Sequence, residues 1–430
     1  MSFKVSRDDQ FAMPPFTPEQ LEKIFFHFDP SDVQDIGGSV IIRHAEYEAH
    51  YPPLLVGGKL AVFCSPTDEI PFGCAINVAN RAGPANDDIG NIGEELESGE
   101  FPSRASFEAL FRAIPDAGAI SYFNGIFTIE FSCWAAAAQH RTRCRRLPSS
   151  ISRCPVSALN GKVKMSSSPN FNLYKDSESD HSLMDLSHYD TLYPGAMVTT
   201  RGRRLMGPTA AGVLVRYKKS FRLTISCQGL VDDDEALTVQ EVRHPSISGN
   251  LIGRISNRIP DTAIALSSLG SPGLFHNNPY FNFPADLTKL LPSTKLRPGQ
   301  VVGIDTFVKG FEQMITAGIR AARIRQPHTA QRASKEIPDE IKYQGMFATN
   351  SRTMQERSNL RANRCGAPVA IISDENDQSN IGGIVGLARF ATIPGYARSI
   401  VCYADCLDSM IDGGWRLVLP GVAMPASRIS

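Results

Sequence analysis

The sequence predicts an all-β C-terminal half, built as a barrel or a sandwich, joined to a smaller α+β N-terminal region. The main observation is a series of short runs of β-forming residues separated by Gly, Pro and Asn, a pattern typical of antiparallel sheets. The runs show no fixed period, which argues against a propeller or a solenoid. They lie at 196–200, 211–217, 221–226, 264–266, 301–305, 319–324, 381–387 and 399–401.

A change in composition separates the two halves. Residues 147–190 contain eleven serines and three prolines, with few apolar residues in register. Such a segment buries too little apolar surface to offset the entropy lost on ordering, so it favours a loose linker. We therefore expect an N-terminal domain over 1–146, a linker over 147–190 and a β-rich domain over 191–420.

The N-terminal region mixes helix and strand signals. Thr17 is a suitable N-cap for a short helix over 18–26. Asn124-Gly125 lies between two β-forming runs, 120–123 and 126–131, which predicts a hairpin. We expect further strands at 39–42 and 60–63, and a helix over 133–146. No residues in this region group into a recognisable catalytic set.

Composition narrows the function classes. The 430 residues include 44 basic and 44 acidic side chains, so no net field attracts nucleic acid or an anionic membrane, and we expect neither as a partner. No apolar run reaches the roughly 18–20 residues of a membrane helix, and the first residues lack the apolar core of a secretory signal. We therefore expect a cytoplasmic protein.

The cysteines and histidines do not predict a metal site. The nine cysteines form no C-x-x-C pair, and the nine histidines form no H-E-x-x-H motif. Cys402 and Cys406 lie four residues apart, which predicts one face of a helix over 402–411 that ends at Gly413-Gly414. We expect two buried thiols there, with no metal and no cofactor.

Three motifs in the β-rich half follow one another in an informative order. The first is 223–228, LTISCQ, which follows the run 211–217 and a charged turn. The second, 261–266 or DTAIAL, begins 33 residues after Gln228. The third is 364–368, RCGAP, whose cysteine lies 104 residues after Asp261 and which leads into the glycine-rich run 381–387.

In this order the motifs resemble those of the chymotrypsin-like proteases, over roughly 195–415. In that family a strand–turn–strand ends in the catalytic His, a D-I-A-L type motif supplies the Asp that orients it, and a nucleophile–Gly–small–Pro turn precedes the strand of the specificity pocket. The Cys-Gly-Ala-Pro form resembles viral-type cysteine proteases and trypsin-like domains of uncharacterised fungal proteins more than digestive trypsin. The resemblance implies two six-stranded antiparallel barrels.

Carried over residue by residue, the resemblance assigns the three positions of a catalytic triad. Cys365 stands at the nucleophile position, Asp261 at the position of the orienting carboxylate and Gln228 at the position of the base. An amide has no titratable group near neutral pH and cannot accept the proton of the nucleophile. The base it replaces typically contributes about 10²–10⁴-fold to the rate.

The oxyanion position departs from the family pattern as well. The family usually has Gly two residues before the nucleophile, where the backbone must present N–H groups to the developing charge. Here Asn363, Arg364 and Cys365 form this segment. Asn tolerates unusual backbone angles better than other non-glycine residues, so we expect an impaired oxyanion hole.

Two further sets of residues complete the expected site. His244 lies 16 residues after Gln228 and is the one candidate for a replacement base, although an His-Pro dipeptide after a strand more often marks a turn. Gly382, Gly383 and Gly386 are expected to line a peptide groove, because no helix follows them as a dinucleotide fingerprint requires.

Three functions remain open at this point. The first is a pseudoprotease that holds a peptide or protein segment between its barrels without cleaving it. The second is an active thiol endopeptidase with Cys365 as nucleophile, Asp261 as orienter and His244 as base. The third is a scaffold whose barrels only display the N-terminal region. An imidazole within about 4 Å of Cys365 would favour the enzyme.

Overall fold

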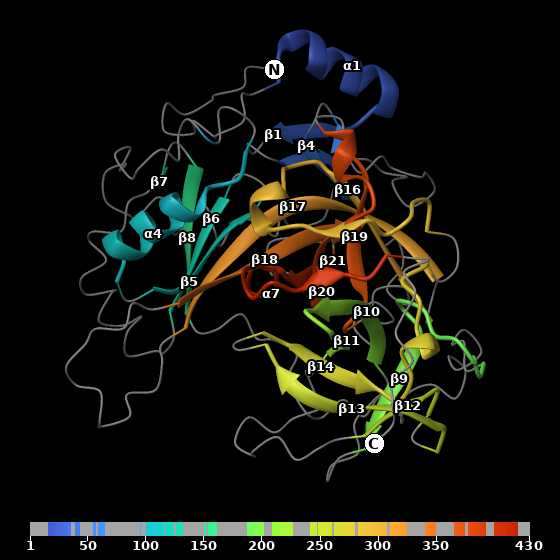
Figure 1. Ribbon diagram of the computed structural model, residues 1–430. Helices are drawn as coiled ribbons and strands as arrows, with labels where there is room; N and C mark the ends of the chain where they lie inside the picture. Colours follow the sequence, from blue (N-terminus) through green and yellow to red (C-terminus); the bar gives the residue numbers. More distant parts are fainter. Residues whose placement is uncertain are drawn as a thin grey trace, which may run out of the picture.

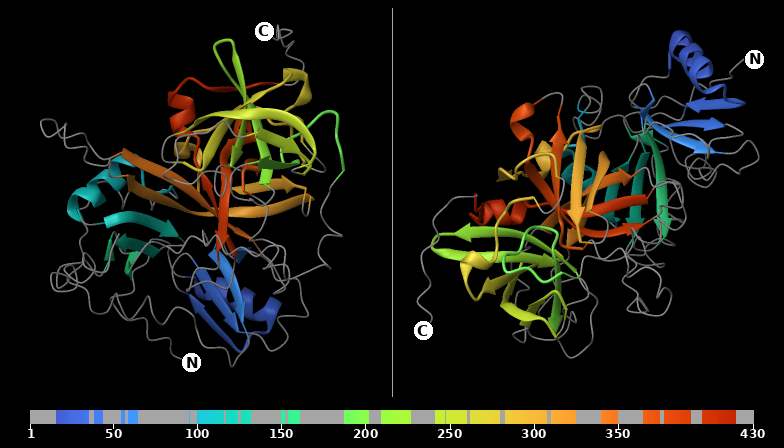
Figure 2. Two further views of the ribbon diagram at one scale, coloured as in Figure 1. Left: turned by 90° about the horizontal axis from the view of Figure 1, so that it is seen from below. Right: turned by 90° about the vertical axis from the view of Figure 1, so that its right-hand side faces the viewer.

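A computed structural model of the chain shows two β-barrels in contact, with two smaller N-terminal pieces on the side of the second barrel (Figure 1). In all views the second barrel lies between the first barrel and the most N-terminal sheet (Figures 1 and 2). The structure describes residues 16–35, 39–43, 55–56, 59–64, 95, 100–115, 117–123, 126–131, 150–151, 154–160, 187–201, 209–226, 241–246, 248–259, 262–279, 283–307, 310–324, 340–349, 365–374, 377–392 and 400–419.

The first barrel is a closed circuit of six antiparallel strands. The strand order is β9-β10-β11-β14-β13-β12, and β12 pairs with β9 to complete the circuit. Alternate side chains such as Leu214, Leu223 and Ile225 fill its interior. The strands are β9 Met197–Arg201, β10 Thr209–Tyr217, β11 Ser220–Ser226, β12 Glu241–His244, β13 Asn250–Arg258 and β14 Ile264–Leu269. A short strand, β22 Arg416–Leu417, joins the sheet beside β10.

The second barrel has the same design. Its strands follow the order β16-β19-β20-β21-β18-β17, and β16 pairs with β17 to close it. The strands are β16 Val301–Thr306, β17 Gly310–Ile324, β18 Glu340–Thr349, β19 Pro368–Ser373, β20 Gly383–Thr392 and β21 Ile400–Asp405; the short β15, Lys289–Leu290, pairs with β20 in parallel. The double six-stranded barrel predicted from the sequence is confirmed.

The N-terminal hairpin extends the sheet of the second barrel. β5, Ala117–Phe123, and β6, Ile126–Phe131, pair in the predicted register, with Phe123 opposite Ile126. β5 also pairs with the second half of β17, beyond the part of β17 that β16 occupies. Strand pairing therefore crosses from the expected N-terminal domain into the β-rich half.

The hairpin and the barrel also share one core. Helix α4, Arg104–Ala113, begins at the N-cap Ser103 and buries Phe107 and Leu110. These side chains belong to the same buried cluster as Phe127 of the hairpin and Phe347 of the barrel. Because burial of a large apolar side chain contributes about 1.5–3 kcal/mol, this shared core ties residues 101–131 firmly to the barrel.

The expected linker contains regular structure at its start. β7, Ser150–Ile151, and β8, Cys154–Asn160, lie inside the range 147–190, and β8 pairs in parallel with β6. Backbone pairing to an existing strand orders this segment even though its composition offers little apolar surface. The rest of the expected linker up to 186 lies outside the described residues.

The first piece of the chain is a helix on a small sheet. α1, Pro18–Phe28, starts at the predicted N-cap Thr17, whose side chain accepts from the backbone N–H of Gln20 in a full capping box. The sheet has the order β1-β2-β4-β3. Its strands are β1 Asp32–Asp35, β2 Ser39–Arg43, β3 Leu55–Val56 and β4 Lys59–Cys64. The two strands predicted here are confirmed.

One predicted helix is wrong in most of its length, and another lies outside the described residues. Over 402–411 the chain continues β21 as far as Asp405, and only α7, Asp408–Asp412, is helical. β21 pairs on both sides, with β18 and β20, so tertiary pairing overrides the four-residue spacing of the cysteines. The helix predicted over 133–146 falls outside the described residues. No helix that the structure describes is long and apolar enough to cross a membrane.

A buried ion pair joins the hairpin to the barrel. Arg320 of β17 donates from Nε and Nη2 to the two carboxylate oxygens of Glu130 of β6, both at 2.8 Å. The two side chains are 7% and 3% exposed. Although burial opposes the charge, the hydrogen bonds and negative charge of Glu130 raise the pKa of Arg320 above its usual value. Arg320 is therefore charged at all ordinary pH values.

We predict that Arg320→Met lowers the free energy of unfolding by about 3–5 kcal/mol, because it leaves the Glu130 carboxylate buried without its cation. The double variant Glu130→Leu/Arg320→Met should recover much of this loss. The control Arg254→Met removes a cation that is 58% exposed and should change stability by less than about 0.5 kcal/mol. Urea unfolding followed by circular dichroism measures all three; equal losses in R320M and R254M would contradict the prediction.

Candidate functional site

Of the residues assigned to the triad and oxyanion positions, only Cys365 lies within the described part of the chain. Gln228, Asp261, Asn363 and Arg364 fall outside it. Cys365 and the strand ends next to the other positions lie close together at the contact between the two barrels.

The turn at Cys365 is held by both barrels. The carbonyl oxygen of Cys365 accepts from the backbone N–H of Ala210 at 3.0 Å and from the hydroxyl of Thr209, both on β10 of the first barrel. The next residue, Gly366, donates its N–H to the carbonyl of Ala388 on β20 of the second barrel, at 2.7 Å. The predicted nucleophile position thus lies where the two barrels meet.

Gly366 is required by the close approach of the first barrel. Its φ of +96° lies in the region that favours glycine, and a Cβ there would be 2.4 Å from the carbonyl oxygen of Ala210 and 3.0 Å from the amide nitrogen of Ser226. Ser226 is the last residue of β11, two residues before Gln228. The end of β11 therefore lies against the Cys365–Gly366 turn.

The described residues on either side of position 261 are anchored to the second barrel. We call Ile259 and residues 262–264 the loop of position 261; the N–H of Ile259 donates to the carbonyl of Ile264 at 2.8 Å. The N–H of Ala263 donates to Oδ2 of Asp405 at 2.6 Å. Asp405 ends β21, so a carboxylate of the second barrel holds the loop of the first.

Asp405 is itself fixed by two polar side chains. Its Oδ1 accepts from Nε2 of Gln344 at 2.7 Å and from Nη1 of Arg389 at 3.2 Å. Gln344 in turn accepts, through Oε1, from Nη1 of Arg320 at 2.7 Å. A continuous chain of hydrogen bonds therefore runs from Glu130 of the N-terminal hairpin to the loop of position 261.

This chain of polar groups was missed in the sequence. A signal was present, because Glu130 follows four β-forming residues of an otherwise apolar strand and Arg320 interrupts an apolar run in the same way. A charged side chain in a strand that is buried on both faces needs a partner of opposite charge. Two such positions of opposite charge in one sequence can therefore be expected to form an ion pair. The identity of the partner depends on strand register, which the sequence does not specify.

The thiol of Cys365 is arranged as a neutral donor. Sγ donates to the carbonyl oxygen of Arg389 at 2.6 Å. Burial raises the pKa of Cys365 to about 12, and the Asp405 charge acts in the same direction, whereas the Arg389 cation lowers it. A nucleophilic cysteine needs a lowered pKa, because the thiolate is the reactive form. In this arrangement Cys365 is a poor nucleophile at neutral pH.

His244, the candidate replacement base, is buried with both ring nitrogens engaged. Nδ1 donates to the carbonyl of Met197 at 2.6 Å, and Nε2 accepts from the N–H of Tyr189 at 3.1 Å. Because the carbonyl only accepts and the amide only donates, the two partners fix the tautomer. This geometry leaves His244 no lone pair for the proton of a nucleophile, and it gives the ring a structural role.

The three glycines expected to line a peptide groove are buried by the chain itself. A Cβ on Gly382 would lie 1.9 Å from the carbonyl oxygen of Asp286, and one on Gly383 would lie 2.2 Å from Leu291. A Cβ on Gly386 would lie 2.9 Å from Ala404. These glycines allow close packing around β20, and the peptide groove expected at their positions stays a prediction.

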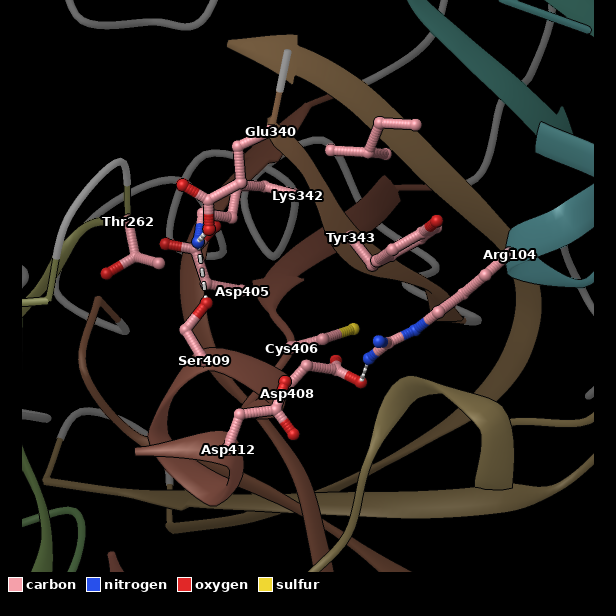
Figure 3. A pocket seen from close by; sticks show the side chains of 11 residues that line it. Arg104, Thr262, Glu340, Lys342, Tyr343, Asp405, Cys406, Asp408, Ser409 and Asp412 are labelled. Carbon is pink, nitrogen blue, oxygen red and sulfur yellow. Dashed lines mark hydrogen bonds and ion pairs between the residues drawn. The ribbon is translucent and has the colours of Figure 1, made fainter. Parts of the chain in front are cut away.

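A pocket of about 190 Å³ lies where α4, the second barrel and the loop of position 261 meet (Figure 3). Arg104 reaches across it to Asp408, and the hydroxyl of Ser409 accepts from Lys342 at 2.7 Å. Its polar side chains are largely paired with one another. Within the described residues, no group of three or more His, Cys, Asp or Glu is arranged to hold a metal ion.

Comparison with known proteins gives matches among solved structures alone. No protein-family model matches the chain, and no curated protein matches it. Protease A of Thermobifida fusca is 11% identical, with 53% of this chain and 99% of that chain covered and a TM-score of 0.34. A Cellulomonas bogoriensis chymotrypsin is 10% identical, with 53% and 98% covered and a TM-score of 0.32. A glutamic acid specific serine protease is 7% identical, with 53% and 100% covered and a TM-score of 0.34. No function is transferred from matches at this level.

We predict that Gly366→Ala destabilises the junction of the barrels more than backbone strain alone explains. The matched control is Gly299→Ala, where φ is +79° but nothing lies within 4 Å of the added Cβ. Gly299→Ala should cost about 1 kcal/mol, and Gly366→Ala at least about 2 kcal/mol more, because its Cβ meets the backbone of β10 and β11. Equal thermal shifts for the two variants would show that the barrels do not approach here as described.

Proposed function

We propose that the double barrel is a catalytically impaired protease fold that binds an extended peptide or protein segment between its barrels without cleaving it. The observation that carries this proposal is the state of Cys365, whose half-buried thiol donates to a backbone carbonyl and has a raised pKa. Hydrolysis by a thiol enzyme needs a thiolate and a base beside it. Cys365, at the nucleophile position, is not a thiolate at neutral pH, because its pKa is raised.

The residues at the base position support the same proposal. Gln228 stands two residues after the strand end that packs against the Cys365–Gly366 turn, and an amide cannot take up a proton near neutral pH. His244 is engaged by two backbone groups and does not replace it. A neutral amide at the base position and a neutral thiol at the nucleophile position can donate and accept hydrogen bonds, which suits a binding site better than a reaction centre.

Loss of chemistry does not remove the means of binding. Peptides bind to exposed strands mainly through backbone hydrogen bonds, which need no nucleophile. The hydrogen bonds from β10 and β20 to the turn, and from Asp405 to the loop of position 261, keep both barrels in fixed positions around this junction. Such a preorganised junction lowers the entropic cost of holding a partner segment. We further propose a cytosolic location, and the thiol state of the described cysteines is in keeping with it.

The first test is turnover of a diverse fluorogenic peptide library by the wild type and by Cys365→Ala. We expect no hydrolysis by the wild type above the background of the variant, because neither a thiolate nor a base is available. Turnover that disappears in Cys365→Ala would instead identify an active thiol endopeptidase. Gln228→His is the next variant, and a gain of activity would show that the base position lies within reach of the thiol.

The second test is binding, since absence of turnover alone also fits a scaffold. Peptides selected from a displayed library of extended sequences should bind the wild type, and Cys365→Trp should weaken binding at least about tenfold because its ring occupies the junction. The control Leu251→Trp adds the same ring at a position on β13 that is 43% exposed and should leave affinity unchanged. Failure to select any peptide, or equal loss in both variants, would favour the scaffold.

A further inference from the structure

The segment that contains the first three strands of the first barrel carries a concentration of positive charge, and the acidic run 232–235 follows it directly in the sequence. The chain is neutral, yet residues 191–231 contain seven arginines and lysines and no aspartate or glutamate. Three of these cations, Arg216, Lys218 and Lys219, are exposed at the tip of the β10–β11 hairpin, and Arg222 follows on β11. Arg416 of β22 is exposed beside them. Arg222 pairs opposite Val215 and therefore faces the other side of the sheet from Arg216. We call the four residues Arg216, Lys218, Lys219 and Arg416 the basic hairpin surface.

The register of the strands places two of these cations directly opposite each other. β10 and β22 pair antiparallel with Arg216 opposite Arg416. Like charges at directly opposed positions destabilise a sheet. The repulsion is not offset locally, because no residue of the basic hairpin surface forms an ion pair with a carboxylate among the residues that the structure describes.

The rest of the hairpin holds these cations in place. The ring centroids of Tyr217 and Trp415 lie 5.5 Å apart. Nζ of Lys218 lies over the Tyr217 ring, 5.0 Å from its centroid. Lys218 has a φ of +54°, in the region that usually favours glycine or asparagine. Arg416 donates from Nη1 to the carbonyl of Trp415 at 3.0 Å. Lys218 and Arg416 are thus held by ring and backbone contacts, and no carboxylate in the part of the chain that the structure describes pairs with either of them.

We propose that the basic hairpin surface docks an acidic segment of a partner protein. Planar guanidinium groups match carboxylates in a two-pronged geometry, and an anion between Arg216 and Arg416 would relieve their repulsion. Single-stranded nucleic acid fits less well, since Trp415 and Lys218 already occupy the Tyr217 ring on which a base would stack. An anionic membrane fits less well, since Tyr217 is only 37% exposed and packs against Trp415 rather than projecting outward.

The basic hairpin surface is distinct from the junction at Cys365. β10 begins at Thr209, which contacts Cys365, and ends at Tyr217, so the two sites are separated by roughly 25 Å along the strand. A partner held at the hairpin tip and a peptide held between the barrels would therefore occupy separate sites. The nearest described carboxylate along the chain from Arg416 is Asp412, which lines the pocket of Figure 3.

Fluorescence anisotropy with a labelled octaglutamate peptide tests the proposal. We expect binding at 50 mM NaCl that weakens strongly at 500 mM NaCl, because exposed charges are screened by salt. Arg216→Gln/Arg416→Gln should weaken binding about tenfold. The same double variant should leave the thermal midpoint unchanged or raise it, since it removes two opposed like charges. A structural role of the two arginines would lower the midpoint instead.

Matched controls and competing probes make the outcome decisive. Lys23→Gln/Arg254→Gln removes two exposed cations outside the basic hairpin surface and should leave affinity within about twofold. Lys219→Gln changes one exposed residue of the β10–β11 turn, so it should weaken octaglutamate binding without disturbing the fold. No binding of octaglutamate at 50 mM NaCl, or equal loss in the control variant, would overturn the proposal. Tighter binding of a twelve-nucleotide oligo-dT or of phosphatidylserine vesicles than of octaglutamate would also overturn it.

Discussion

The guanidinium of Arg320 is the group on which the arrangement of this molecule depends most. It is buried, it is charged, and all three of its nitrogens donate to side chains, namely Gln344 on the neighbouring strand β18 and Glu130 on β6, which lies beyond β5. A buried cation of this kind is tolerated only while its partners stay in place. The N-terminal hairpin that contributes Glu130 is therefore a structural part of the second barrel, and the same requirement fixes the register of β6, β17 and β18 relative to one another.

Arg320 is connected to the junction of the barrels through Gln344 and Asp405. Gln344 accepts a hydrogen bond from Arg320 and donates one to Asp405, and Asp405 accepts from the N–H of Ala263 in the loop of position 261. A second set of contacts, from β10 and β20, holds the Cys365–Gly366 turn. The geometry of a two-barrel site is thus maintained by backbone groups and buried polar side chains. A well-ordered site need not be reactive, because a thiol that is fixed in place but has a raised pKa is largely protonated and is a poor nucleophile.

Short β-forming runs separated by Gly, Pro and Asn predict a barrel or a sandwich, and the double barrel is what the resemblance of three motifs to those of the chymotrypsin-like proteases implies. The sequence also predicts the capping box of α1 and the 120–131 hairpin, where local signals and the final fold agree. It fails at 402–411, where helical spacing competes with strand pairing on two sides, and at the start of the linker, where β8 is ordered by a neighbour rather than by its own composition. The roles of His244 and of the glycines at 382, 383 and 386 depend on which groups pack against them, and the sequence does not specify those groups.

The central claim is that Cys365 is a neutral thiol in the folded protein, and the pH dependence of its alkylation by iodoacetamide tests this most directly. With a pKa of about 12, the thiolate fraction at pH 8 is about 10⁻⁴, so Cys365 in the native protein should react about a thousandfold more slowly than in urea. Mass spectrometry of the Cys365 peptide gives both rates. Rapid alkylation of the folded protein with a midpoint below pH 8 would show an activated thiolate and would contradict the account of this protein as a binding module.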